Sequence, residues 1–483
     1  MKILDRYIVR SFLFTVLLFF LVMMSLRITV DLFLNMDEFT KKVSKTVAVE
    51  VDGKLTHVIK KRDPKFAEIV TNVVGYYSYQ SLMYFTELGG VIIVASAAFS
   101  LARMNHTNEL TAMLAAGVSL HRVIWPIILC AMLLGGLVIL DQEAVIPQVA
   151  DKLVRSRDDV PGTEEFAVYG TTDGGGSAWY AEMFFPATSV LRRPVVMVRD
   201  ESYRLLASIP GSQARPAKVR GQSGWILSDA VLARTAWAGK PRRHVSGTER
   251  VWTQIGPKTL LRRTGVGLEA SAQITCIREV RAEDVPAGLL IEAERFVPER
   301  SEDGRIIGGV LEKPRFTFTS ETNQPLGSFL AAEARWSSDQ DAAGAEGNWR
   351  LSGGEMFYPS DLTIDDLILR RDIRWLDFMS SSQLNRLLQL DQVSNRDAAL
   401  LTKHLRVTSP INNLVMLLLG LPFILSRQRN IKASAALCLL MVAAFYAFIY
   451  ICRYVELGPT LSAWLPVLLF GPVAAVMLDS IKT

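Results

Sequence analysis

The sequence is poor in the residues that build catalytic and metal sites. Its 483 residues include four cysteines and five histidines. The histidines are scattered, no Cys/His spacing of the zinc-binding kind occurs, and no paired carboxylates fall within the apolar runs. Cys276 stands alone in the polar part of the chain, which excludes a disulfide framework there. We therefore expect no catalytic site, no cofactor and no metal.

Two further absences exclude nucleotide hydrolysis and nucleic-acid binding by this chain. No G-x-x-x-x-G-K-[ST] phosphate loop occurs anywhere in the sequence. Lys and Arg number 53 against 48 Asp and Glu, and the resulting net charge of +5 is small for this length. The chain has neither a nucleotide-binding loop nor the strongly basic surface that nucleic acids attract.

Apolar residues, by contrast, are abundant and concentrate at the two ends of the chain. They make up 50% of the sequence, and six runs approach the ~20 residues that cross about 30 Å of hydrocarbon. The first run is too long for the apolar core of a signal peptide, and no small-residue cleavage site follows it. We predict six transmembrane helices over Phe12–Leu34, Leu82–Leu101, Val123–Leu140, Ile411–Leu425, Ala433–Cys452 and Ala463–Leu478.

Between the third and fourth runs lies a polar block, Asp141–Arg406, that is far longer than a loop. Many short strand-like runs at about ten-residue spacing, separated by Gly, Pro, Asp and Ser, are typical of a sandwich or jelly roll. The predicted fold class is therefore six transmembrane α-helices plus a large extracytoplasmic β-rich, jelly-roll-like domain inserted between helices 3 and 4. The predicted boundaries are 1–140, with an extracytoplasmic connector at 35–81, then 141–405 and 406–483.

Two of the expected strand runs, Gly224–Leu232 and Trp349–Tyr358, share a short sequence. The first begins Gly-Trp-Ile-Leu-Ser, and the second follows Asn348 to give Asn-Trp-Arg-Leu-Ser. So short a match does not establish an internal repeat, and we interpret it as coincidence.

Basic residues before the first run set the predicted orientation. Lys2, Arg6 and Arg10 favour a cytoplasmic N-terminus by the positive-inside rule. The connector at 35–81 is also rich in lysine, so the charge count over all loops is close to a tie and the N-terminal flank decides. With six spans, both termini are expected in the cytoplasm and the β-rich domain on the opposite side.

The first run carries two ionisable residues near its C-terminal end, Arg27 and Asp31. One interpretation is an i, i+4 ion pair close to the interface, with Arg27 reaching toward the headgroups. The other is that these charges face a bundle interior or a transport pathway. The residue pattern leaves both interpretations open.

The most informative segment is Asn105–Pro126, where the pattern predicts a short helix outside the bilayer near 108–117. Asn108 is a candidate N-cap, and Gly117 suits the left-handed position that follows a helix. One helical face carries Leu110, Met113, Leu114, Gly117 and Val118. The segment holds no Lys or Arg up to Leu120, which favours a protein partner over the membrane interface as the cover for this face.

Glu109 begins this predicted helix and has two interpretations. An acid in the first turn is favoured by the helix dipole, by about 0.3–1 kcal/mol. Alternatively, its charge contacts an arginine of the partner. The dipole explanation is sufficient on residue types alone.

Several of these segments resemble a known family. The opening Leu-Asp-Arg-Tyr-Ile, the segment Asn108–Leu120, and Arg406-x-x-x-Pro410 followed by Leu-Leu-Gly-Leu-Pro-Phe look like the LptF/LptG permease family. That family supplies the membrane subunits of the bacterial lipopolysaccharide exporter. The resemblance implies a multi-pass subunit of an ABC exporter in the inner membrane, which passes extracted lipid to a periplasmic bridge of β-jelly rolls.

The same resemblance implies partners and site residues. The partners are a cytoplasmic ATP-binding dimer, a second related permease subunit or a second copy of this chain, and the periplasmic bridge. The residues implied in coupling to the ATPase are Glu109, Leu110, Met113, Leu114, Gly117 and Val118. The candidates for binding the phosphates of a lipopolysaccharide-type lipid are Arg27, Lys41 and Lys42. The alternative function is a membrane-anchored periplasmic scaffold or sensor without transport activity.

The chain departs from the family pattern in two respects. The connector at 35–81 and the block Asp141–Arg406 are longer than usual, which predicts extra strands or an inserted subdomain. Family members of the G type carry a lysine near the outer end of the first span, and a gapless alignment places Asp31 there. The resemblance therefore leaves the F-like or G-like role open.

Overall fold

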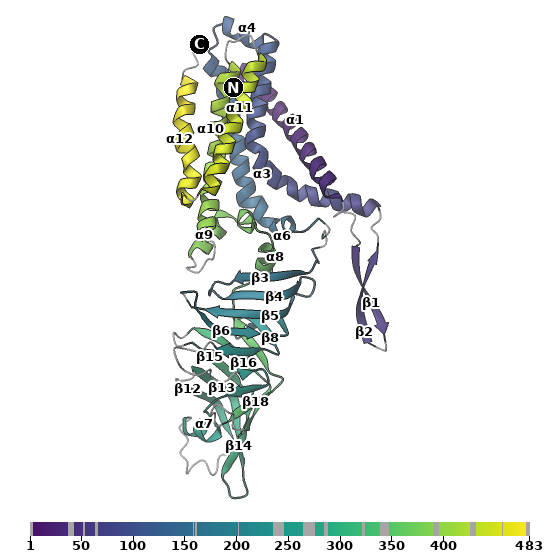
Figure 1. Cartoon of the computed structure of the whole chain (residues 1–483), viewed down its shortest axis with the longest axis vertical. Coiled ribbons are helices and arrows are strands. Elements are labelled where there is room, and N and C mark those ends of the chain that lie inside the picture. Colours follow the sequence, from purple (N-terminus) through teal and green to yellow (C-terminus); the bar gives the residue numbers. More distant parts are fainter. Residues whose placement is uncertain are drawn as a thin grey trace. The chain divides into compact units, whose positions relative to one another are not determined.

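The computed structural model describes residues 3–36, 43–51, 54–62, 66–157, 159, 162–200, 202–234, 246–263, 276–284, 288–320, 324–338, 347–389, 396–425, 431–455 and 457–479. The chain divides into two compact units (Figure 1). The first, here called the helical unit, comprises Met1–Gly162, Asp372–Gln389 and Asn395–Thr483. The second, the β-unit, comprises Thr163–Arg371 and Leu390–Ser394.

Six helices in the described part of the chain are long and apolar enough to cross a membrane, which confirms the predicted number. They are α1 (Ile3–Leu34), α3 (Phe66–His106), α5 (Leu120–Leu140), α10 (Arg396–Leu425), α11 (Ile431–Tyr454) and α12 (Pro459–Asp479). Shorter helical segments of the same unit are α4 (Glu109–Ala115), a π-helical turn (Asp141–Val145), a 3₁₀ turn (Ile146–Gln148), α6 (Ala150–Leu153), a second 3₁₀ turn (Trp375–Phe378) and α9 (Ser381–Gln389).

Within the helical unit, α10 is the central element and packs against α3, α5, α11 and α12. A β-carbon at Gly90 of α3 would collide with the side chain of Asn413, so the glycine is what lets α3 approach α10 closely. The core between the helices includes the buried side chains of Phe12 from α1, Ile127 from α5 and Leu417 from α10. These long apolar helices therefore bury part of their surface against one another and leave the rest for lipid.

The connector after α1 contains a hairpin of two antiparallel strands, β1 (Val43–Val51) and β2 (Lys54–Arg62). The register pairs Val43 with Arg62 at one end and Val51 with Lys54 at the other. The connector, for which the sequence predicted extra strands or an inserted subdomain, thus contains two paired strands.

The β-unit is a closed, barrel-like sheet of antiparallel strands (Figure 1). The strands are β3 (Phe166–Thr172), β4 (Ala178–Phe185), β5 (Val190–Arg199), β6 (Leu205–Pro210), β7 (Gln213–Val219), β8 (Gln222–Ser228), β9 (Val231–Arg234), β10 (Ser246–Gly247), β11 (Arg250–Trp252), β12 (Ile277–Asp284), β13 (Leu289–Arg300), β14 (Ile306–Glu312), β15 (Arg315–Thr319), β16 (Pro325–Leu330), β17 (Glu333–Ser337), β18 (Asn348–Ser352) and β19 (Glu355–Pro359). Two short helices belong to the same unit, α7 (Pro257–Arg263) and α8 (Ile364–Leu369). Its interior is packed with large side chains, among them Trp179, Trp225 and Trp349. The predicted β-rich, jelly-roll-like domain between the third and fourth membrane helices is confirmed.

The two similar pentapeptides, residues 224–228 and 348–352, occupy equivalent positions in this sheet. Trp225 of β8 and Trp349 of β18 are both fully buried. The Trp225 indole donates a 2.9 Å hydrogen bond to the carbonyl of Leu362, and the Trp349 indole donates a 3.0 Å bond to the carbonyl of Ile255. Each tryptophan therefore makes the same kind of contact, a hydrogen bond from its buried indole N–H to a main-chain carbonyl.

The backbone repeats the same pattern before each tryptophan. Arg193 and Lys313 have positive φ angles of 47° and 45°, and each precedes a proline. The Arg193 N–H donates to the carbonyl of Ser212 at 2.8 Å, and the Lys313 N–H donates to the carbonyl of Ala332 at 2.8 Å. Non-glycine residues rarely adopt positive φ angles. The matching angles and hydrogen bonds therefore indicate that Arg193 and Lys313 occupy equivalent positions in the two halves of the sheet.

Strand pairing extends this equivalence over most of the β-unit. β3–β4, β7–β8 and β6–β9 in the first half correspond to β12–β13, β17–β18 and β16–β19 in the second. The long strand β5 corresponds to β14 and β15 together, because β4 pairs with β5 while β13 pairs with both β14 and β15. The interpretation of the pentapeptides as coincidence is therefore wrong. The β-unit is an internal repeat.

Candidate functional site

The predicted short helix is present as α4, between α3 and α5, and backbone geometry sets its ends. Asn108 precedes it with a φ of 60° and makes no side-chain cap, contrary to the expectation. At the other end Gly117 has a φ of 80°. Its N–H donates to the carbonyl of Leu114 at 3.0 Å, while the N–H of Val118 donates to the carbonyl of Met113 at 3.0 Å. This is a Schellman closure, in which glycine takes the left-handed position without strain.

Most of the apolar face of α4 packs onto the helical unit itself. Leu110 is buried, and Met113 and Val118 are partly buried against the core formed by the membrane helices. Leu114 is 41% exposed, and Gly117 is also exposed. The apolar face of α4 that remains exposed is therefore small and centred on Leu114, while the other apolar residues attach α4 to the bundle.

Glu109, the first residue of α4, is bound to α1. The hydroxyl of Tyr7 donates a 2.6 Å hydrogen bond to Oε2 of Glu109. One turn further along α1, the Ser11 hydroxyl accepts a 2.7 Å bond from Arg103 and lies 3.2 Å from the Ser100 hydroxyl. Polar contacts thus join the beginning of α1 to the end of α3 and to α4.

At its other end, α1 carries the two charges that the sequence singled out. Asp31 forms a 3.0 Å ion pair with Arg157 and accepts a 2.7 Å hydrogen bond from the Tyr77 hydroxyl. The guanidinium of Arg27 lies over the ring of Tyr84, 5.1 Å from its centre. Arg27 and Asp31 therefore do not form the i, i+4 ion pair of the first interpretation, because each has a different partner. The other candidate cations, Lys41 and Lys42, lie outside the described residues.

Sequence reasoning missed the cations that follow the third span. The guanidinium of Arg157 lies 5.8 Å from the ring centre of Tyr76, and the Lys152 ammonium lies 4.9 Å from that of Tyr79. Contacts of this kind contribute about 0.5–1 kcal/mol at exposed sites. The sequence feature that could have indicated these cations is the group of tyrosines within residues 76–84. Their aromatic faces contact cations from α1 and from the segment that follows α5.

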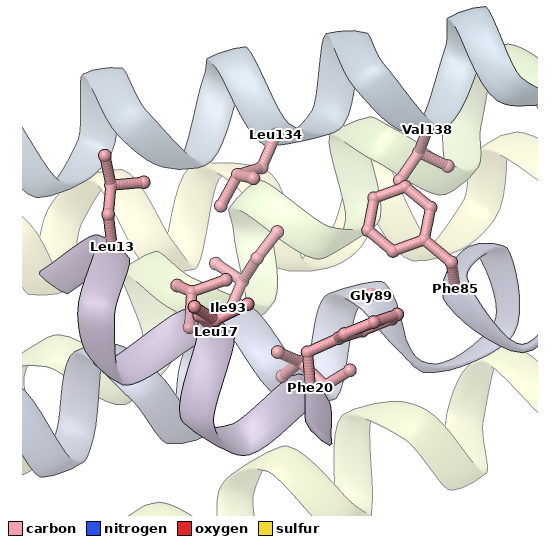
Figure 2. Close-up of a pocket in the computed structure, with 10 residues that line it drawn as sticks. Leu13, Leu17, Phe20, Phe85, Gly89, Ile93, Leu134 and Val138 are labelled. Carbon is pink, nitrogen blue, oxygen red and sulfur yellow. The ribbon is translucent and has the colours of Figure 1, made fainter. Parts of the chain in front are cut away.

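An apolar pocket of about 230 Å³ lies between α1, α3 and α5 (Figure 2). Leu13 lies at one end of it, and Phe20, Phe85 and Val138 lie toward the other (Figure 2). At Gly89 the backbone itself forms part of the wall. The lining is wholly apolar, so the pocket suits hydrocarbon rather than a charged or polar ligand.

The chain matches the family model described as "Lipopolysaccharide export system permease LptF/LptG" over residues 69–234 and 287–479. The matched residues cover α4, α5, α10, α11, α12, nearly all of α3 and most of the β-unit, whereas α1 and the β1–β2 hairpin lie outside them. No curated protein matches the chain. The match extends over well more than half of the sequence and agrees with six membrane helices around a β-rich unit. The chain therefore belongs to the LptF/LptG family of lipopolysaccharide export permeases, multi-pass proteins of the inner membrane.

Proposed function

We propose that this chain is the membrane subunit through which a separate ATPase drives the extraction of lipopolysaccharide, or a related lipid, toward a periplasmic β-jelly-roll bridge. Burying one acyl CH₂ group is worth about 0.8 kcal/mol, so removing a multi-chain lipid from the membrane requires external energy. The complex would comprise a cytoplasmic ATP-binding dimer, a second permease subunit or a second copy of this chain, and the bridge. Both termini and α4 would lie in the cytoplasm, and the β-unit in the periplasm.

The observation that carries the ATPase part of the proposal is the position of α4. It lies between two membrane helices, at the same end of the helical unit as both chain termini (Figure 1). Leu110, Met113 and Val118 attach it to the bundle, while Leu114 and Gly117 are accessible. A force applied to this small face by a partner therefore passes directly to α3 and α5, and Glu109 supplies a charge beside it.

The lipid-binding part of the proposal rests on the other end of α1. Arg27 is exposed there and offers a cation to a phosphate. Phe20 of the apolar pocket precedes it on α1 by about 10 Å along the helix axis, at 1.5 Å per residue. A phosphate at Arg27 would thus leave an acyl chain within reach of the pocket. Lys41 and Lys42 remain candidate cations from the sequence.

The substitution Glu109→Gln tests the coupling role, because glutamine removes the charge and keeps an oxygen that can accept the Tyr7 bond. We expect ATP-driven release of lipopolysaccharide from proteoliposomes to fall about tenfold, within the range of coupling energies between linked sites. Assembly with the ATP-binding subunit and the unfolding temperature should not change. Thr111→Ala, at an exposed position of the same helix, is the matched control and should release lipid as the wild type does.

Two results would contradict the proposal at different levels. Unchanged release and unchanged lipid-stimulated ATPase activity in Glu109→Gln would show that Glu109 does not couple. A wild-type chain that purifies from its native membrane without any ATP-binding subunit, and releases no lipid with ATP, would instead support the scaffold or sensor.

A further inference from the structure

Arg406, from the Arg406-x-x-x-Pro410 segment of the sequence, has no role in the proposed function and is buried within α10. Its side chain is only 6% exposed. Its main-chain partners precede α9, which lies at the end of the helical unit opposite α4 (Figure 1). The guanidinium forms a 3.0 Å ion pair with Glu143 and donates to the main-chain carbonyls of Asp377, at 3.2 Å, and Met379. Because the planar guanidinium is satisfied by groups from separate segments, it fixes those segments relative to one another.

Glu143 forms the other half of this junction. It lies in the π-helical turn that directly continues α5. Its carboxylate accepts hydrogen bonds from the N–H and the hydroxyl of Ser381, at 2.8 and 2.5 Å. π-Helical turns interrupt the regular helix and occur often at functional sites. One ion pair therefore connects the end of α5 to α10 and to the segment Trp375–Ser381.

α5 connects this junction to α4. It begins at Leu120, three residues after Gly117, and ends at Leu140, immediately before the π-helical turn. At 1.5 Å per residue, its length is about 31 Å. A single continuous helix thus has α4 at one end and Glu143 at the other, so a displacement of the first is transmitted to the second.

We propose that the Glu143–Arg406 ion pair is the junction through which α5 passes the movement of α4 to Trp375–Ser381. This segment is where the chain returns from the β-unit to the membrane helices. Glu143 and Arg406 are positioning residues in this scheme, and neither contacts the lipid. The inference rests on the proposed docking of an ATPase at α4, but it concerns a separate pair of residues at the opposite end of the bundle.

The test uses the complete transporter, reconstituted with its ATP-binding subunit in proteoliposomes that contain lipopolysaccharide. Glu143→Gln keeps the shape of the side chain and removes its charge, and Arg406→Lys keeps the charge and removes the planar fork. We expect ATP-driven lipid release to fall about tenfold in each, with ATPase activity in the absence of lipid within about twofold of the wild type. Glu87→Gln is the matched control, because its 3.5 Å ion pair with Arg374 is half-exposed, and it should behave as the wild type.

The outcomes distinguish a failure of the ion-pair inference from a failure of the proposed function. Assembled Glu143→Gln and Arg406→Lys transporters that release lipid at the wild-type rate would overturn the inference. If either variant fails to assemble, the test uses Ser381→Ala, which removes the hydroxyl bond to Glu143 and leaves the ion pair intact. An intermediate loss of lipid release in this variant would support the inference. Release at the wild-type rate would overturn it. A wild-type transporter without ATP-driven release would contradict the proposed function instead.

Discussion

The hydroxyl of Tyr7, near the beginning of α1, donates a 2.6 Å hydrogen bond to Oε2 of Glu109, the first residue of α4. The bond joins the first membrane helix to the helix that we propose as the ATPase contact. Arg103 adds a second connection by donating to Ser11 at 2.7 Å. Since α1 carries Arg27 near its other end, a displacement of α4 has a direct route along α1 to the proposed phosphate contact.

Tyr7→Phe should weaken this route without unfolding the chain. The change removes one hydroxyl and leaves the Glu109 charge available to a partner. A hydrogen bond to a charged group contributes about 1.5–3 kcal/mol when sheltered, and less at this exposed position. We expect ATP-driven lipid release to fall about fivefold while the ATP-binding subunit still co-purifies. Tyr169→Phe, at a tyrosine that is 82% exposed in the β-unit, is the control; equal release from both variants would rule out a role for the Tyr7 bond.

The architecture could be predicted from the sequence because it depends on local patterns. Long apolar runs give membrane helices, and short runs between Gly, Pro and Asp give strands. The ends of the strands were harder to predict from the sequence. The expected strand Gly224–Leu232 is two strands that separate at Asp229, with a φ of 48°, and Trp349–Tyr358 separates at Gly353, with a φ of 63°. Hydropathy carries no information about a single left-handed residue.

The contacts of the candidate site were harder to predict, because they join residues far apart in the chain. Asp31 pairs with Arg157, 126 positions away, and Glu109 accepts from Tyr7, 102 positions away. A single sequence shows the type of each residue but not its partner. The internal repeat was concealed for a related reason, since it lies in backbone angles and strand pairing while only a few side chains match.

Asp31→Asn should strengthen the binding of an anionic lipid. Asp31 neutralises Arg157 at 3.0 Å and lies one helical turn from Arg27. Asparagine keeps the size of the side chain and removes the negative charge, so the local potential becomes more positive. We expect the affinity for lipopolysaccharide to rise about threefold at low salt, and less at high salt because of screening.

The measurement is lipopolysaccharide binding to the purified chain at two salt concentrations. Asp151→Asn is the control, because its ion pair with Arg155 joins residues only four positions apart and Asp151 is half-exposed. Weaker binding by Asp31→Asn would show that Asp31 acts by positioning Arg157 rather than by opposing the lipid charge.

The two halves of the β-unit should respond alike to the same substitution. Trp225→Phe and Trp349→Phe each remove an indole N–H from a buried carbonyl and leave space beside a smaller ring. We expect each to lower the free energy of unfolding by about 2–4 kcal/mol. Trp336→Phe, at a partly buried ring 5.2 Å from Trp349, should cost less. Chemical unfolding of the purified full chain checks this, and a large difference between the first two would argue against equivalent halves.

Asp173 should make the stability of the β-unit depend on pH. Its side chain is buried, and burial raises the pKa of this carboxyl, although hydrogen bonds from the Trp179 indole at 3.2 Å and the Ser360 hydroxyl at 2.8 Å act in the opposite direction. Because the folded-state pKa lies above the unfolded value of about 3.9, the folded chain binds the proton more tightly than the unfolded chain.

Protonation of Asp173 therefore stabilises the fold, and this contribution is complete below about pH 4 and is lost as the pH rises through the folded-state pKa. Asp173→Asn lacks a titrating group at this position. We expect the unfolding temperature of the wild type, relative to Asp173→Asn, to be highest near pH 4 and to decline toward neutral pH. Ser360→Ala removes a bond that favours the charged form, so its decline should occur at higher pH. Thermal unfolding followed by tryptophan fluorescence measures both, and a wild-type advantage that grows with pH would mean that the hydrogen bonds outweigh burial.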